Sequence, residues 1–187
     1  MYSTFAFGKY TREAGFTKFG IQRNEPGDHD VQFDVKFCGI CHTDVHFADP
    51  NSPIAKYPLV PGHELAGIVT KVGSKVADVK VGDEVGVGVL SDSCMECGNC
   101  DDGEEQACEK GVSQTYNSDT VHGHIKTGTG FTQGGYCGSM TAHRRFIVKV
   151  PKGYPLEMTG PILCAGKAHN KSNETERLLQ GSPCIPH

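Results

Sequence analysis

The chain has 187 residues, enough for one domain with a sizeable core but too few for two full-sized domains. Its 18 basic and 22 acidic side chains give a formal net charge of −4 without long runs of one sign, which disfavours a nucleic-acid partner, a zinc-ribbon module included. No basic and apolar leader follows Met1 and no apolar run is long enough to cross a membrane, so we expect a cytoplasmic protein without a membrane partner.

The first half of the chain predicts short strands separated by turns. Residues 31–37 alternate apolar and polar side chains, as a half-buried strand requires. Residues 65–72 are rich in β-branched side chains, so His63 and Glu64 lie where a loop enters a strand. The same pattern returns over residues 79–89, with a turn expected near their middle.

The second half of the chain is poorer in strand signals. Residues 91–135 are polar and rich in glycine and predict a loop region, whereas residues 145–151 alternate and predict a further strand closed by proline. The stretch GTGFTQGG at 128–135 follows no clear strand and opens no helix, so we interpret it as a turn rather than a phosphate-binding loop. These elements predict a mainly β fold with short helices, in the form of an antiparallel or mixed barrel.

Nine cysteines in a chain without an export signal favour metal binding over a disulfide framework, because cytosolic thiols are kept reduced. Four of them share one polar loop with the spacing CxxCxxCxxxxxxxC: Cys94, Cys97, Cys100 and Cys108. Such spacing suits a closed tetrahedral zinc site of structural type, and glycines at 98 and 103 would let backbone N–H groups approach the sulfurs. Disulfides, a redox switch and an iron–sulfur cluster are the weaker alternatives.

A second constellation lies outside this loop, in the segments CGICHTDVH, PGHE and PILCAG. Two thiols and an imidazole from Cys41, His63 and Cys164 could hold a zinc ion with one open position. These residues are far apart in the sequence, and a lone histidine or cysteine more often has a structural role in the core. The residues alone leave both interpretations open.

Taken in order, CGICHTDVH, YPLVPGHELAGIV, VKVGDEVGVG, the four-cysteine loop, TQGGYCGSM and PLEMTGPILCAG make the chain resemble the zinc-dependent medium-chain alcohol dehydrogenases. The resemblance spans about residues 5–166 and is greatest to the cinnamyl-alcohol-dehydrogenase-like branch. It implies a GroES-like β-barrel catalytic domain over residues 1–166, with a structural zinc lobe at about 91–112.

The resemblance also implies roles for individual residues. The structural zinc ligands would be the four cysteines of the loop, and the catalytic zinc ligands Cys41, His63 and Cys164, with Glu64 as an occasional alternative. Thr43 would bond the substrate oxygen and His46 would pass the proton to solvent. Asp44 would hold the His63 ring in the metal-binding tautomer. Unligated thiols are expected at Cys38, Cys137 and Cys184, and exposed loop histidines at His122 and His124.

By the same resemblance the reaction is the reversible oxidation of a primary alcohol to an aldehyde with NADP(H) or NAD(H). Members of the family hold this cofactor in a Rossmann domain, through which they also form homodimers, and no GxGxxG motif of such a domain occurs in the chain. Residues 167–187 depart from the family pattern and are expected to form a divergent, disordered tail. Two hypotheses follow: a truncated zinc-dependent oxidoreductase with a small-molecule alcohol or aldehyde substrate, or a zinc-binding remnant without activity.

Overall fold

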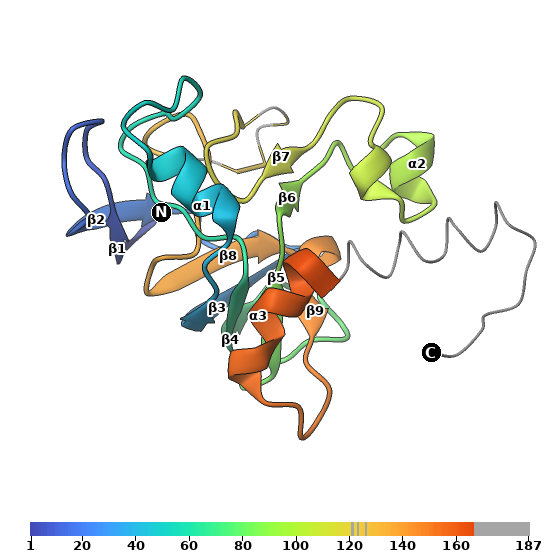
Figure 1. Ribbon diagram of the computed structural model, residues 1–187. Coiled ribbons are helices and arrows are strands. Elements are labelled where there is room, and N and C mark those ends of the chain that lie inside the picture. Colours follow the sequence, from blue (N-terminus) through green and yellow to red (C-terminus); the bar gives the residue numbers. More distant parts are fainter. Residues whose placement is uncertain (121, 123, 126, 167–187) are drawn as a thin grey trace, which may run out of the picture.

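A five-stranded antiparallel sheet forms the centre of the computed structural model, which describes residues 1–120, 122, 124–125 and 127–166 (Figure 1). Each strand pairs with its neighbours in the antiparallel sense. The order across the sheet is β8 (Ser139–His143), β3 (Asp30–Cys38), β4 (Leu65–Val72), β5 (Glu84–Val87) and β9 (Val148–Lys149).

The main core lies against this sheet because buried and more exposed side chains alternate along its strands. Val31 and Phe33, two residues apart on β3, face the same side and are fully buried. The cluster that they form is completed by β4, β5, β8 and two flanking positions: Leu65, Val69, Val79, Val85, Val87, Met140, Ala142 and Ile147. The segments that carry Cys41, His63 and Glu64 therefore lie next to the ends of β3 and β4, which this apolar core holds in place.

Two smaller sheets flank the centre. The hairpin of β1 (Tyr2–Gly8) and β2 (Thr17–Arg23) lies at one side, and β6 (Leu90–Asp92) pairs with β7 (Ser113–Gln114) at the base of a lobe on the other side (Figure 1). The α-helices are short: α1 (His42–Ala48), α2 (Gly98–Asp101) and α3 (Thr159–Pro161). Single turns complete the chain: η1 (Glu105–Ala107), η2 (Arg144–Phe146), η3 (Leu156–Met158) and the π-type η4 (Ile162–Gly166).

The mainly β fold with short helices is confirmed, and the strands predicted at 31–37 and 65–72 correspond to β3 and β4. Within residues 79–89 the expected turn is confirmed at Gly82, whose φ is 88°, and the strand after it is β5, which begins at Glu84. The strand predicted at 145–151 is largely wrong. The N–H of Ile147 donates to the carbonyl of Arg144, which closes a 3₁₀ turn and leaves a strand of two residues.

Two further expectations concern the C-terminal tail and membrane-spanning helices. The tail at 167–187, with Cys184, lies outside the described residues. Within the described ranges, no helix combines the length and the apolar character that crossing a bilayer requires.

Candidate metal centres

The four cysteines of the loop converge on one point. Their sulfurs all lie within 4.8 Å of one another, and none is in a disulfide. The Sγ atoms of Cys94 and Cys100 are 3.9 Å apart, and those of Cys97 and Cys108 are 4.0 Å apart. Four sulfurs bound to one tetrahedral Zn²⁺ at about 2.3 Å each would be separated by about 3.8 Å. The cluster therefore has the size of a four-thiolate zinc site.

The lobe that carries this cluster has little apolar packing of its own. Its buried cluster consists of Cys94, Cys97 and Cys100, with Cys108 packed against them. The backbone N–H groups of Glu109 and Cys100 lower the pKa of the Cys97 thiol to about 6, which favours a metal-binding thiolate. The lobe is fastened to the sheet from outside, where Arg145 donates to the carbonyl of Cys100 at 2.7 Å.

The expected role of two glycines in this lobe needs correction. A Cβ atom at Gly98 would have its nearest neighbour at 3.7 Å, and one at Gly103 would meet nothing within 4 Å. Neither glycine is required for a close approach to the sulfurs. Gly103 instead supplies a turn at φ 79°, a backbone conformation that side chains with a Cβ rarely adopt.

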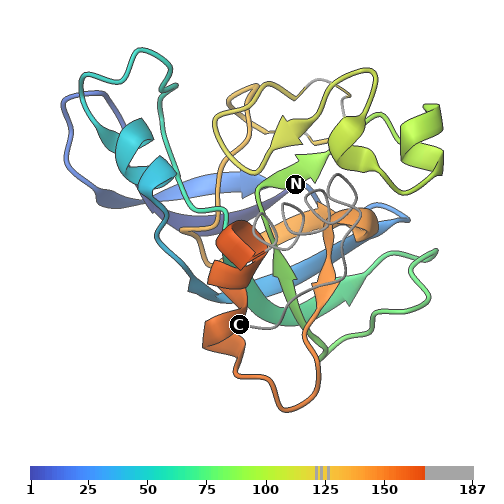
Figure 2. The same ribbon diagram turned by 45° about the vertical axis from the view of Figure 1, so that its right-hand side comes forward.

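The second constellation also comes together, although its members are up to 123 positions apart. One ligand atom each from Cys41, His63, Glu64 and Cys164 lies within 4.8 Å of the other three. Cys41 precedes α1, His63 and Glu64 precede β4, and Cys164 lies in η4. Figure 2 shows α3 and η4 in orange-red in front of the sheet, which brings the last ligand to the first three.

His63 carries the clearest sign of a missing partner. The residue is 4% exposed, and its Nε2 atom has no hydrogen-bond partner among the described residues. Its ring stacks on the ring of Tyr116, with centroids 5.7 Å apart and planes 6° apart, so the ring orientation is fixed. A buried imidazole nitrogen next to two thiols and a carboxylate is a donor set that Zn²⁺ favours. The residues of this cluster therefore fit a zinc ion.

Glu64 and Cys164 reach the cluster through close backbone packing. Gly39 faces the Glu64 carboxylate, and a Cβ atom there would lie 2.0 Å from its Oε2. On the other side, a Cβ at Gly160 would lie 2.3 Å from the Glu64 carbonyl oxygen. Burial and the adjacent Cys41 thiol raise the pKa of Cys164 to about 12. The Sγ atoms of these two cysteines are 3.9 Å apart, close to the separation that a shared zinc ion would impose.

Asp44 plays a different part from the one expected. The carboxylate is 3% exposed and accepts hydrogen bonds from the backbone N–H groups of Cys41 and Gly62, each at 2.8 Å, and from Tyr136 Oη at 3.2 Å. These bonds go to the two ligand-bearing segments rather than to the His63 ring. Asp44 therefore holds the backbone segments of Cys41 and Gly62 together, and stacking on Tyr116 orients the His63 ring.

Thr43 and His46 lie on α1, three residues apart and so on the same helix face. Thr43 Oγ1 is 3.6 Å from Cys41 Sγ, beside the second cluster and half-buried. His46 is exposed, and its ring lies edge-on to that of His42 at 4.4 Å between centroids. The helix thus leads from the cluster to the surface.

The sequence did not single out Tyr116, Tyr136 or Arg23, which support this cluster from outside. The only signal for Tyr116 was an aromatic side chain in an otherwise polar loop. Tyr136 and Arg23 act through contacts that only the folded sheet creates, since they lie 92 and 110 positions from partners with which they form hydrogen bonds.

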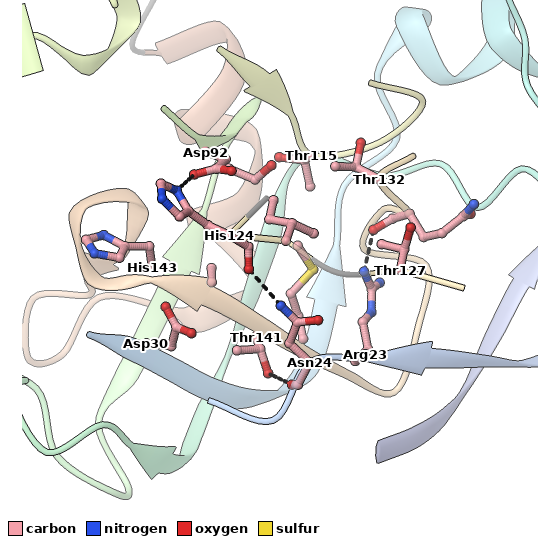
Figure 3. Close-up of a pocket in the computed structure, with 15 residues that line it drawn as sticks. Arg23, Asn24, Asp30, Asp92, Thr115, His124, Thr127, Thr132, Thr141 and His143 are labelled. Atoms are coloured by element: carbon pink, nitrogen blue, oxygen red, sulfur yellow. Dashed lines mark hydrogen bonds and ion pairs between the residues drawn. The ribbon is translucent and has the colours of Figure 1, made fainter. Parts of the chain in front are cut away.

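Within the described residues, the remaining thiols, Cys38 and Cys137, and the loop histidines His122 and His124 lie outside both clusters. Burial raises the pKa of Cys38 to about 12, and Cys137 is buried. His124 is half-exposed, but its Nδ1 atom lies 2.9 Å from the buried carboxylate of Asp92 at the edge of a small pocket (Figure 3). His122 bonds the carbonyl of Gly111 at 2.9 Å. Both histidines thus have defined partners in the loop.

Residues 27–152 match the family model of the alcohol dehydrogenase GroES-like domain. The chain is 49% identical over 148 residues to the probable cinnamyl alcohol dehydrogenase 6 of Oryza sativa subsp. japonica, a match that covers 79% of this chain and 39% of that protein. It is 43% identical over 161 residues to the NADP-dependent alcohol dehydrogenase C of Mycobacterium tuberculosis (strain CDC 1551 / Oshkosh), covering 86% of this chain and 45% of that protein.

Among solved structures, a cinnamyl alcohol dehydrogenase from Sorghum bicolor superposes with a TM-score of 0.84 at 35% identity, covering 95% of this chain and 49% of that one. An enzyme from Helicobacter pylori, described as CAD complexed with NADP(H), gives a TM-score of 0.82 at 33% identity and covers 94% and 49%. The chain therefore spans less than half the length of these relatives.

Proposed function

The chain belongs to the alcohol dehydrogenase family with a GroES-like domain, and on that premise we propose that it binds two zinc ions and serves the reversible oxidation of a primary alcohol to an aldehyde with NADP(H). The observation that carries the proposal is the second cluster, where a buried imidazole nitrogen without a partner meets two thiols and a carboxylate. The names of the relatives support NADP(H) over NAD(H) and an aromatic alcohol such as a cinnamyl alcohol.

Cys41, His63 and Cys164 would hold the catalytic ion, with Glu64 beside them as an alternative ligand. A zinc ion in this place supplies a Lewis acid, which lowers the pKa of a bound hydroxyl group. Tyr116 keeps the imidazole in its plane, and Asp44 holds the two ligand segments at a fixed separation. Both arrangements pre-organise the donors before any substrate arrives.

The proton that the alcohol loses needs a path to water. The hydroxyl group of Thr43 can accept this proton and donate its own onward, because a hydroxyl is both donor and acceptor. His46, on the same face of α1 and exposed, can release the proton to solvent, because its imidazole ring has one nitrogen that accepts a proton and one that donates. These two residues would therefore carry the proton from the buried cluster to the surface.

Cys94, Cys97, Cys100 and Cys108 would hold the structural ion, whose four thiolates leave no position for substrate. We propose that this ion replaces the hydrophobic core that the lobe lacks, because metal binding then contributes directly to folding.

A second candidate is a zinc-binding polypeptide without turnover. It requires only the two donor clusters, both of which lie within the described residues. In this case both zinc ions bind, and no nicotinamide cofactor is oxidised or reduced.

One preparation distinguishes the two candidates. The 187-residue chain, purified from zinc-supplemented cells, is assayed for zinc content and for oxidation of NADPH in the presence of cinnamaldehyde. Two zinc ions with turnover that His63→Ala abolishes and the surface variant His122→Ala preserves would support the enzyme. Two zinc ions without turnover would favour the second candidate, and loss of the second zinc ion in the wild-type chain would refute both.

A further inference from the structure

Arg23, the last residue of β2, is a buried cation with an unusual set of partners. The residue is 6% exposed, and no carboxylate pairs with it in the part of the chain that the structure describes. Its Nη1 atom donates to the carbonyl of Gln133 and its Nη2 atom to the carbonyl of Gly134, each at 2.6 Å. Nη2 also lies 3.3 Å from Cys137 Sγ. Figure 3 marks a hydrogen bond of the Arg23 guanidinium with a dashed line.

This arrangement is costly for the fold. A guanidinium without a carboxylate keeps most of its desolvation penalty, and Arg23 Nε has no partner among the described residues. An apolar side chain would fill the same space at lower cost. The feature that an arginine adds is a rigid fork of donors, which fits two successive carbonyls at once.

The two carbonyls belong to a segment that holds the approach to His63. We call residues 133–136 the bracket loop. Its backbone donates from Gly134 to Val60 at 2.7 Å, from Gly135 to Gly62 at 2.8 Å and from Tyr136 to Pro61 at 3.0 Å. The residue that follows these three acceptors is His63 itself. The bracket loop therefore fixes the backbone on which the imidazole stands.

The same loop reaches the Cys41 segment. Tyr136 Oη donates to Asp44 Oδ2 at 3.2 Å, and this carboxylate accepts the backbone N–H of Cys41 at 2.8 Å. Its other oxygen accepts the N–H of Gly62 at 2.8 Å. Two of the ligand segments are thus joined through one loop, whose two leading carbonyls are held by Arg23.

We propose that Arg23 is a positioning residue for the second metal centre, acting through the bracket loop on the backbones of His63 and Cys41. This inference rests on the proposed function, since it concerns the affinity of the same site for zinc. Arg23 touches none of the presumed ligands, so its effect reaches the metal only through the hydrogen bonds of the loop.

The test compares Arg23→Met, Arg23→Lys and Tyr136→Phe with Arg12→Met in the full 187-residue chain. Arg12 is a matched control, because its Nη1 atom donates to the carbonyl of Pro50 at 3.0 Å on the surface, far along the chain from the bracket loop. Zinc affinity at each centre is measured by competition with a chelator, and Co²⁺ is then added to read the coordination of each centre from its visible absorption.

We expect Arg23→Met to weaken zinc binding at the second centre by about 10- to 100-fold, the range found for residues that orient metal ligands, while the four-cysteine centre keeps its affinity. Arg23→Lys should lose less affinity because it restores one of the two carbonyl contacts, and Tyr136→Phe should weaken the same centre alone. Arg12→Met should change neither.

Two zinc ions bound by Arg23→Met with wild-type affinity would overturn the inference and leave the proposed function intact. Loss of both ions together with the native circular dichroism would also overturn it, because Arg23 would then serve folding as a whole. A wild-type chain that binds only the four-cysteine ion would instead refute the proposed function.

Discussion

Removal of one sulfur from the lobe should unfold the lobe and leave the sheet folded. Cys100 is the ligand of choice, since it is fully buried with its Sγ atom 3.9 Å from that of Cys94. Cys100→Ala leaves three thiolates, and the lobe has no apolar cluster other than its cysteines. A structural zinc ion contributes about 10–16 kcal/mol of apparent binding free energy, as much as the whole stability of an ordinary domain. The lobe has no other interaction of that size.

The central sheet does not depend on these sulfurs. Its core cluster contains none of the four cysteines. Arg145, which follows β8, contacts the lobe through a hydrogen bond to the carbonyl of Cys100 and an ion pair with Glu105. Unfolding of the lobe should therefore stay local. In the Cys100→Ala chain, amide hydrogen exchange should lose protection across residues 93–111 and keep it in β3 and β4, while the zinc content falls by one ion.

Cys38→Ala is the control, because it removes a half-buried thiol that belongs to neither cluster. This variant should keep both zinc ions and the protection of the lobe. Continued protection of residues 93–111 in Cys100→Ala would show that the lobe folds without this sulfur. Simultaneous loss of protection in the lobe and the sheet would show that unfolding of the lobe is not local.

Three further predictions concern packing and pH. Tyr116→Ala should lower the free energy of unfolding by about 3–5 kcal/mol and weaken zinc binding through His63. Tyr116→Phe keeps the stacked ring and loses only the hydroxyl group, so urea denaturation should find it close to wild type. Burial lowers the pKa of His143 below its ordinary value of 6.5, because the buried ring favours the neutral form. Its contribution to stability is therefore complete above pH 6.5 and is lost as the pH falls. Between pH 7.5 and pH 5, the urea midpoint of His143→Gln should decline less than that of the wild-type chain. Gly135→Ala would place a Cβ 2.3 Å from a buried leucine side chain and should cost about 1–3 kcal/mol, while Gly128→Ala, with nothing within 4 Å, should leave the thermal midpoint nearly unchanged.

The strands that the sequence predicts best are those with one buried face. The alternation predicted for residues 31–37 holds at Val31 and Phe33, which enter the core while their neighbours stay outside it, and it ends at a register shift before the exposed Phe37. Residues 145–151 alternate as clearly, yet most of them form no strand. There the hydrogen bond from Ile147 to Arg144 and the ion pair of Arg144 with Asp78 favour a turn, and neither contact can be read from a local pattern.

The two candidate metal clusters also differ in how far a local sequence pattern predicts them. Cys94 to Cys108 lie within one loop, so their spacing alone indicates a shared ion. Cys41 and Cys164 meet across 123 positions, and only the resemblance to a family allowed them to be grouped. The supporting residues could not be predicted at all, because the fork of Arg23 and the stacking of Tyr116 exist only after the sheet has placed distant loops side by side.

We propose that one chain holds two distinct zinc centres, and the zinc content of the purified chain shows whether it does. The wild-type chain, prepared without chelators and desalted, should contain two zinc ions, and Cys41→Ser should contain one, since it removes a ligand of the second cluster and none of the first. One zinc ion or fewer in the wild-type chain would rule out two zinc centres, and two zinc ions in Cys41→Ser would rule out Cys41 as a ligand of the second.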